Sequence, residues 1–202
     1  MPLDTLLALT AFAFVSTWTP GPNNMMLAAS GATWGWRQTL PHALGVALGF
    51  PIMAFSVALG LGQVFIAFPI FGQALAWIGC TIMLWLAWRI ATAAPPAADD
   101  APQGRGRPLS FVEASAFQWI NPKAWVMTIG VSASFVRGET PLIDALAIMV
   151  AFVCAGLTSS QAWVLFGTAA ARLLGRGAGL RAFNIAMALL LAISALWLVI
   201  DN

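Results

Sequence analysis

Charged side chains are scarce in this sequence. Of its 202 residues, 8% are charged and 60% are hydrophobic, and the mean hydropathy is +0.87. A soluble domain carries roughly a quarter charged residues, because its surface faces water. We therefore expect most of the surface to face membrane lipid. The net charge is only +2 and the cations are scattered singly, so the chain lacks the basic face that nucleic-acid binding requires.

Lysine, histidine and cysteine are also rare, which excludes several kinds of site. Lys123 is the only lysine and follows a proline, so the sequence has no Gly-Lys-Ser/Thr loop for nucleotide phosphates. His42 is the only histidine, and Cys80 and Cys154 lie singly in apolar runs, so we expect no multi-histidine or paired-cysteine metal site. No nucleophile–base set stands out either. We therefore predict that the chain is not an enzyme and needs neither a metal nor another cofactor.

Long apolar runs are what the sequence has in abundance. A bilayer core of about 30 Å takes roughly 20 apolar residues per helix. Six runs reach that length, over residues 3–28, 39–64, 69–91, 111–135, 141–166 and 180–200. The polar stretch 94–110 divides them into three and three, and an odd number of spans per half turns the second half upside down. The sequence thus predicts an all-α membrane protein. It would be a single transmembrane domain over residues 1–202, with about six transmembrane helices arranged as two inverted three-helix repeats (1–93 and 111–202).

The arginines predict how the chain is oriented. Arginine and lysine are retained on the cytoplasmic side of a membrane. The loops after the first, third and fifth runs contain Arg37, Arg89, Arg105, Arg107, Arg172, Arg176 and Arg181, whereas the opposite side contains only Arg137. We therefore place the 94–110 loop in the cytoplasm and both termini in the periplasm of a bacterial inner membrane that the chain crosses several times.

The first apolar run contains the segment Thr19-Pro20-Gly21-Pro22-Asn23-Asn24. Two prolines around a glycine remove backbone donors and clash with the preceding helical turn, so a helix must break or kink here. Within lipid, the backbone groups freed by a break are tolerated only where they are buried in protein or face a watery cavity. A single proline often marks a harmless kink, but here two asparagines add donors and acceptors. We therefore predict a contribution to a binding site from Pro20, Gly21, Pro22, Asn23 and Asn24.

The fourth apolar run contains Asn121-Pro122-Lys123, about ten residues from its start. At 1.5 Å per residue this places Lys123 roughly 15 Å into the membrane, too deep for its side chain to reach either surface. A lysine there costs about 2.5–3.5 kcal/mol on insertion scales, so a function is the default interpretation. None of the neighbouring carboxylates is expected at that depth (Asp4, Glu113, Asp144). The lysine would then serve a substrate carboxylate or proton coupling, and the alternative is a structural ion pair.

The two segments occupy corresponding positions, each in the first run of its half. Paired helices interrupted by proline or glycine are a sequence indication of a transporter binding site. The ends of broken helices offer amide groups to an anion and carbonyl groups to a cation. An amino acid zwitterion needs both, so we predict that Asn121, Pro122 and Lys123 share one site with the first segment.

Glycine pairs at a four-residue spacing occur at Gly31/Gly35 and Gly45/Gly49. Small residues at this spacing let helices approach closely within membranes. We predict that Gly45 and Gly49 pack the second helix tightly within the chain, with a homodimer seam as the alternative.

These segments, with Arg37 between Gly31 and Gly49, resemble the lysine-exporter/homoserine–threonine-resistance family of bacterial translocators. The length and the three-plus-three division are similar too, so the resemblance covers essentially the whole chain. It implies export of amino acids or close derivatives from the cytoplasm, driven by the proton motive force, with Pro20–Asn24 and Asn121–Lys123 forming the central site. The family spans cationic, neutral and hydroxy amino acids. Because no carboxylate is expected in mid-span, we predict a small neutral amino acid as substrate, and Lys123 as the candidate for proton coupling.

A channel-like passive pore for small polar solutes or ions is the alternative function. It would share the broken helices but would need no proton coupling. Counterflow in vesicles distinguishes the two, because a pore cannot concentrate a labelled solute against its gradient.

Overall fold

The computed structural model describes residues 1–93, 106–137, 140–175 and 177–200. Most of the predicted cytoplasmic loop (94–105, with Arg105) and Arg176 lie outside these residues. The described part is helical and contains no strand. Its elements are α1 (Leu3–Trp18), α2 (Pro22–Ser56), a π-helical turn η1 (Val57–Leu61), α3 (Gly62–Ala67), α4 (Pro69–Ala91), α5 (Phe111–Ile120), α6 (Pro122–Phe135), α7 (Pro141–Leu174) and α8 (Ala178–Ile200).

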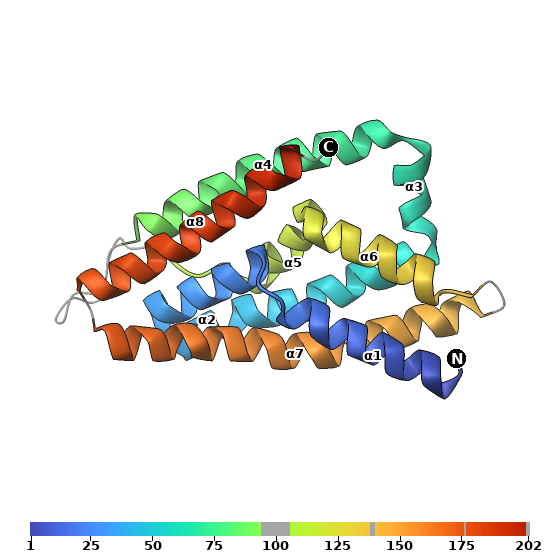
Figure 1. The fold of residues 1–202 in the computed structure, drawn as a ribbon, viewed down its shortest axis with the longest axis horizontal. Coiled ribbons are helices and arrows are strands. Elements are labelled where there is room, and N and C mark those ends of the chain that lie inside the picture. Colours follow the sequence, from blue (N-terminus) through green and yellow to red (C-terminus); the bar gives the residue numbers. More distant parts are fainter. Residues whose placement is uncertain (94–105, 138–139, 176, 201–202) are drawn as a thin grey trace.

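The long helices lie roughly along one common direction and the short α3 runs across it, with α1, α2, α6 and α7 in a main body and α4 paired with α8 along one side (Figure 1). Phe152, Met53 and Leu9 are fully buried in the core of the main body. A separate apolar cluster joins α4 to α8 through Met83 and Leu191. Many large apolar side chains are exposed on the outside, as lipid-facing side chains would be.

The helix α2 reverses direction at Gly35. Gly35 has φ +77° and ψ 171°, in the left-handed half of backbone space that glycine tolerates. Ser30 Oγ and His42 Nδ1 lie 3.2 Å apart although they are 12 residues apart in the chain. A straight helix would separate them by about 18 Å. The helix α2 is therefore a hairpin with a first arm (22–34) and a second arm (36–56).

Glycines allow both arms of α2 to pack closely. A Cβ at Gly31 in the first arm would lie 2.3 Å from the carbonyl oxygen of Val164 in α7. In the second arm, a Cβ at Gly45 would lie 2.5 Å from Phe111 O, and one at Gly49 would lie 2.7 Å from Ser115 Cα, both in α5. The predicted tight packing of Gly45 and Gly49 within the chain is thus confirmed. The homodimer stays a prediction.

Both predicted helix breaks are present. The chain leaves the helical conformation between Trp18 and Pro22, where α1 ends and α2 begins, and again at Asn121, between α5 and α6. Both breaks lie near the middle of the molecule's length (Figure 1). The outer ends of α5 and α6 and the bounds of α4 coincide with the predicted runs.

Four helical segments of the described residues are long and apolar enough to cross a membrane: Pro22–Leu61, Ile70–Ala91, Pro141–Leu174 and Ala178–Trp197. The shorter α1, α5 and α6 have 16, 10 and 14 residues. The structure therefore confirms an all-α protein with several helices of membrane-spanning length. The count of six transmembrane helices and the inverted repeat stay predictions.

Candidate functional site

The two helix breaks meet through Lys123. This lysine is the second residue of α6, and its side chain reaches across to the end of α1. The Nζ atom lies 3.2 Å from the carbonyl oxygen of Pro20 and 3.4 Å from that of Thr19. The partners that the structure gives this half-buried ammonium are thus backbone carbonyls rather than a carboxylate.

Side chains from two other segments also bind the end of α1. The amide Nδ2 of Asn24 donates to Thr17 O at 2.8 Å and to Thr19 O at 2.9 Å. Ser159 Oγ, from α7, donates to Thr17 O at 2.8 Å. The last carbonyls of a helix have no partner within the helix, so these donors supply what the break removed. Asn24 and Ser159 are buried, which makes the interactions part of the protein core.

A reciprocal amide pair joins the second residue of α2 to α5. Asn23 Nδ2 donates to Gln118 Oε1 at 2.8 Å, and Gln118 Nε2 donates back to Asn23 Oδ1 at 3.2 Å. Gln118 is fully buried. Sequence reasoning did not select Gln118, although a lone amide three residues before Asn121 in an apolar run was the available signal.

The second break presents an unused acceptor. Asn121 is the N-cap residue of α6, but its side chain makes no capping hydrogen bond. It is 2% exposed, and its Oδ1 has no hydrogen-bond partner within the described residues. Buried polar groups are normally paired, so this oxygen is available to a ligand or a water molecule.

Two helices begin at the site. The helices α2 and α6 both have proline at their first position, and neither has a side-chain cap. Proline suits that position because its missing N–H would be unpaired there anyway. The N-terminal end of a helix carries partial positive charge. Two such ends beside the Lys123 ammonium create a region that favours an anion.

Two cavities share this region. The central cavity has an empty volume of about 510 Å³, including its part open to solvent, and lies between both breaks, the second arm of α2 and α7. Its lining includes the polar residues Asn23, Asn24, Asn121, Lys123, Ser159 and Ser160, together with Gly21 and Pro22, and the apolar residues Val46, Phe50, Met127 and Phe152. The second cavity lies towards α4 and α8, and its lining includes Met83, Ile193 and Trp197. Gly21, Pro22, Asn121 and Lys123 line both cavities.

The structure brings together all eight residues predicted for the site, because each lines at least one of the two cavities. Pro20 and Pro122 line the second cavity, Asn23 and Asn24 line the central one, and the other four line both. Lys123 is the only charged residue among the described residues that line either cavity. The amides of Asn23 and Asn24 are engaged by the protein in this structure, which leaves Asn121 as the asparagine with an unpaired buried oxygen among the described residues of the site.

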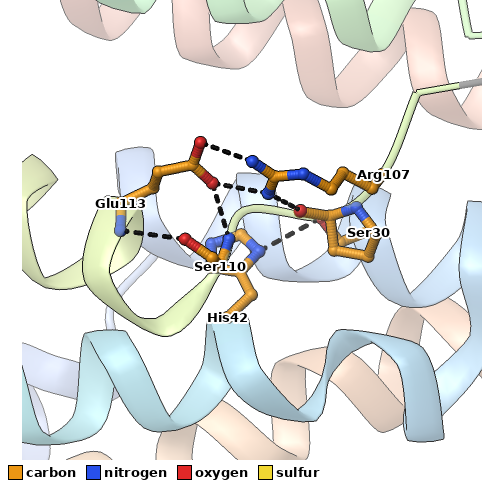
Figure 2. A network of polar contacts seen from close by, with 6 residues as sticks. Ser30, His42, Arg107, Ser110 and Glu113 are labelled. Atoms are coloured by element: carbon orange, nitrogen blue, oxygen red, sulfur yellow. Dashed lines mark hydrogen bonds and ion pairs between the residues drawn. The ribbon is translucent and has the colours of Figure 1, made fainter.

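A separate polar network lies where α5 begins (Figure 2). Ser110 accepts from the backbone N–H of Glu113, and Glu113 accepts from the backbone N–H of Ser110, which forms a capping box. The Arg107 guanidinium donates to both carboxylate oxygens of Glu113 at 2.6 and 2.7 Å, and these hydrogen bonds raise the pKa of Arg107 above its ordinary value. His42 lies beneath this network and contacts Ser30. The charged groups therefore fix the start of α5 and lie apart from the Lys123 site.

Comparison with known proteins assigns the chain to a family. A family model described as LysE type translocator matches residues 14–202. The chain belongs to the LysE type translocator family. Cysteine/O-acetylserine efflux proteins of Escherichia coli (strain K12) and Salmonella typhimurium (strain LT2) are 31% and 30% identical to it over 191 residues. Each alignment covers 94% of this chain and 95% of the relative. No solved structure matches.

Membership of the LysE type translocators confirms the resemblance that the sequence motifs indicated. Together with the four helices of membrane-spanning length, it makes the chain a multi-pass membrane transport protein. The matched region contains both helix breaks and every residue of the candidate site.

Proposed function

We propose that this LysE type translocator is a secondary active exporter of small neutral amino acids or their derivatives, coupled to proton entry across the bacterial inner membrane. The observation that carries the proposal is the arrangement of charge around the two breaks. Lys123 and the N-terminal ends of α2 and α6 favour a carboxylate, while the α1 carbonyls and Asn121 Oδ1 favour an ammonium. An amino acid carries both groups on one carbon.

The cavity lining supports a neutral side chain on the substrate. A cationic side chain would need a carboxylate, and the described lining residues include none. The apolar wall around Phe50 and Phe152 suits a small uncharged side chain, with Ser159 and Ser160 as nearby polar groups. The named relatives, which are efflux proteins for cysteine and O-acetylserine, agree with this substrate class.

Six membrane crossings in two inverted halves follow if the hairpin α2 is counted as two arms. The first crossing is then α1 with the first arm of α2, broken at Thr19–Gly21, and the fourth is α5 with α6, broken at Asn121. The turn of α2, the end of α4 and the end of α7 lie at one end of the molecule, opposite the N-terminus and α3 (Figure 1). This agrees with cytoplasmic first, third and fifth loops and with periplasmic termini.

In the proposed cycle, the two halves rock about the site and expose it alternately to cytoplasm and periplasm. Lys123 binds the substrate carboxylate when charged and is the candidate group for coupling export to proton entry. The substrate, protons and membrane lipid are the partners that this cycle requires.

The test is transport by purified protein in proteoliposomes. We expect wild-type protein to concentrate a labelled small neutral amino acid by counterflow, and Lys123→Met to lose that activity. Gly130→Ala is the matched control, because it lies in the same helix and a Cβ there meets nothing within 4 Å. Flux without accumulation would favour the channel-like pore. Wild-type flux from Lys123→Met would remove the lysine from the mechanism.

A growth screen identifies the substrate. Cells that express the chain are challenged with toxic amino-acid analogues, and we expect tolerance to analogues of small neutral amino acids. Tolerance restricted to cationic analogues would contradict the proposed substrate class.

A further inference from the structure

The carbonyl oxygens at the C-terminal end of α1 are bound by side chains from other segments. Thr17 O and Thr19 O accept from the Asn24 amide, and Thr19 O and Pro20 O lie beside Lys123 Nζ. The C-terminal end of a helix carries partial negative charge. A cation is therefore stabilised at this position, and in the structure that cation is the lysine ammonium.

The contacts between Lys123 Nζ and the two carbonyl oxygens are long for hydrogen bonds. An N–H···O hydrogen bond is typically about 2.9–3.0 Å between heavy atoms, whereas the two Lys123 contacts measure 3.2 and 3.4 Å. Asn121, whose Oδ1 is buried and unpaired in the described residues, lines the same two cavities as Lys123. An ammonium that entered from either cavity could therefore use the carbonyls together with this oxygen.

We propose that the α1 carbonyls and Asn121 Oδ1 form a binding site for a primary ammonium group. Lys123 fills this site when the transporter is empty, and the ammonium of the substrate replaces it there as Lys123 moves onto the substrate carboxylate. The exchange step rests on the proposed function. One cation is always present at the α1 carbonyls, so Pro20 O keeps a cationic partner when the substrate binds.

Gly21 provides the space that this exchange needs. A Cβ at Gly21 would lie 2.9 Å from Lys123 Nζ and 3.0 Å from its Cδ. The φ angle of Gly21 is −177°, which is extended backbone that any residue adopts, so glycine is not needed there for its conformation. The absence of a side chain lets the lysine reach the carbonyls.

The first test asks whether a free ammonium replaces the lysine. Purified Lys123→Ala is unfolded thermally in detergent with methylammonium chloride, sodium chloride or tetramethylammonium chloride at equal concentration. We expect methylammonium to raise the Tm of Lys123→Ala by at least about 2 °C over the other two salts, a shift of the size that regained hydrogen bonds give, and to leave wild type unchanged. Equal effects of methylammonium and sodium, or an equal rise in wild type, would overturn the ammonium site.

The second test retains the lysine and therefore does not depend on Lys123→Ala folding. Lys123 is the only lysine of the chain, so its acylation by an amine-reactive reagent can be followed at one residue by peptide mass spectrometry. We expect Gly21→Ala to increase the rate of Lys123 acylation severalfold, because the new Cβ displaces the ammonium from the carbonyls. Gly130→Ala, whose Cβ meets open space, should match wild type. An unchanged rate in Gly21→Ala would show that the lysine is not held at the carbonyls.

Neither readout uses transport, so the two proposals can fail separately. If methylammonium stabilises Lys123→Ala but proteoliposomes accumulate no amino acid, the ammonium site stands and the proposed function falls. If export is observed and methylammonium has no specific effect, the function stands and this site is withdrawn.

Discussion

Both helix breaks combine proline with asparagine, but they differ in what they contribute. At the break between α1 and α2, three residues separate the helices, and side chains bind the exposed carbonyls of α1. At the break between α5 and α6, one residue separates the helices, and it leaves a buried oxygen unpaired within the described residues. This later break also supplies the cation, Lys123, that reaches the earlier one. A pair of interrupted helices can therefore divide the two charges of a zwitterion between them.

The largest expected difference comes from replacing an asparagine by leucine beside the first break and, separately, at the second break. Asn24→Leu removes a buried amide that donates to Thr17 O and Thr19 O, so we expect the free energy of unfolding to fall by about 1–3 kcal/mol. Asn121→Leu removes an oxygen with no partner in the described residues, so we expect little change in stability but a loss of transport.

Thermal unfolding in detergent and counterflow in proteoliposomes, run side by side on both variants, measure this difference. If Asn121→Leu destabilised the protein as much as Asn24→Leu, Asn121 Oδ1 would have a structural partner and the contrast between the breaks would be lost.

A neighbouring helix, α4, closely confines the second break. A Cβ at Gly79 of α4 would lie 2.3 Å from the carbonyl oxygen of Ile120, which ends α5. We expect Gly79→Ala to lower the free energy of unfolding by about 1–3 kcal/mol, the usual range for overpacking, and to slow transport by shifting the break at Asn121. Gly72→Ala, in the same helix but with open space around the new Cβ, should do neither. Equal stability of the two variants would show that α4 does not confine the break.

The smallest expected effect on stability concerns the N-terminal ends of α1 and α5, the helices that precede the two breaks. Ser110 caps α5, whereas Pro2 gives α1 no side-chain cap. Ser110→Ala should therefore cost about 1 kcal/mol and speed amide hydrogen exchange in the first turn of α5. Ser56→Ala, which removes only a hydrogen bond to the serine's own helix, is the control. Unchanged exchange in Ser110→Ala would mean that the Arg107–Glu113 pair alone fixes this end.

Much of the fold follows from local chemistry in the sequence. The prolines at positions 20, 22 and 122 lack an N–H and exclude a continuous helix, so both breaks could be placed to within a few residues. The length of the apolar runs likewise predicted the bounds of α4 and the outer ends of α5 and α6. The hairpin at Gly35 agrees with the predicted interval between the first two runs.

The partners of the site residues could not be predicted in the same way. The sequence suggested that Asn23 and Asn24 would be available to a substrate, yet their amides bind Gln118 and the end of α1. The only sequence signal for Gln118 was a lone amide in an apolar run, and Gly79 had none, because a single glycine in such a run has no local signature. The role of such a residue depends on which distant segment of the chain packs against it.

The sequence alone predicted three features: the chain is a membrane protein, two of its helices break, and one lysine lies far from the ends of its apolar run. These features are local, because each depends on the backbone chemistry or polarity of a few adjacent residues. The packed fold was needed to show that the lysine of one break lies at the carbonyls of the other, and that Gly21 leaves room for it. Hydrogen bonds and van der Waals contacts act over a few ångströms, so they depend on which distant segments folding brings together.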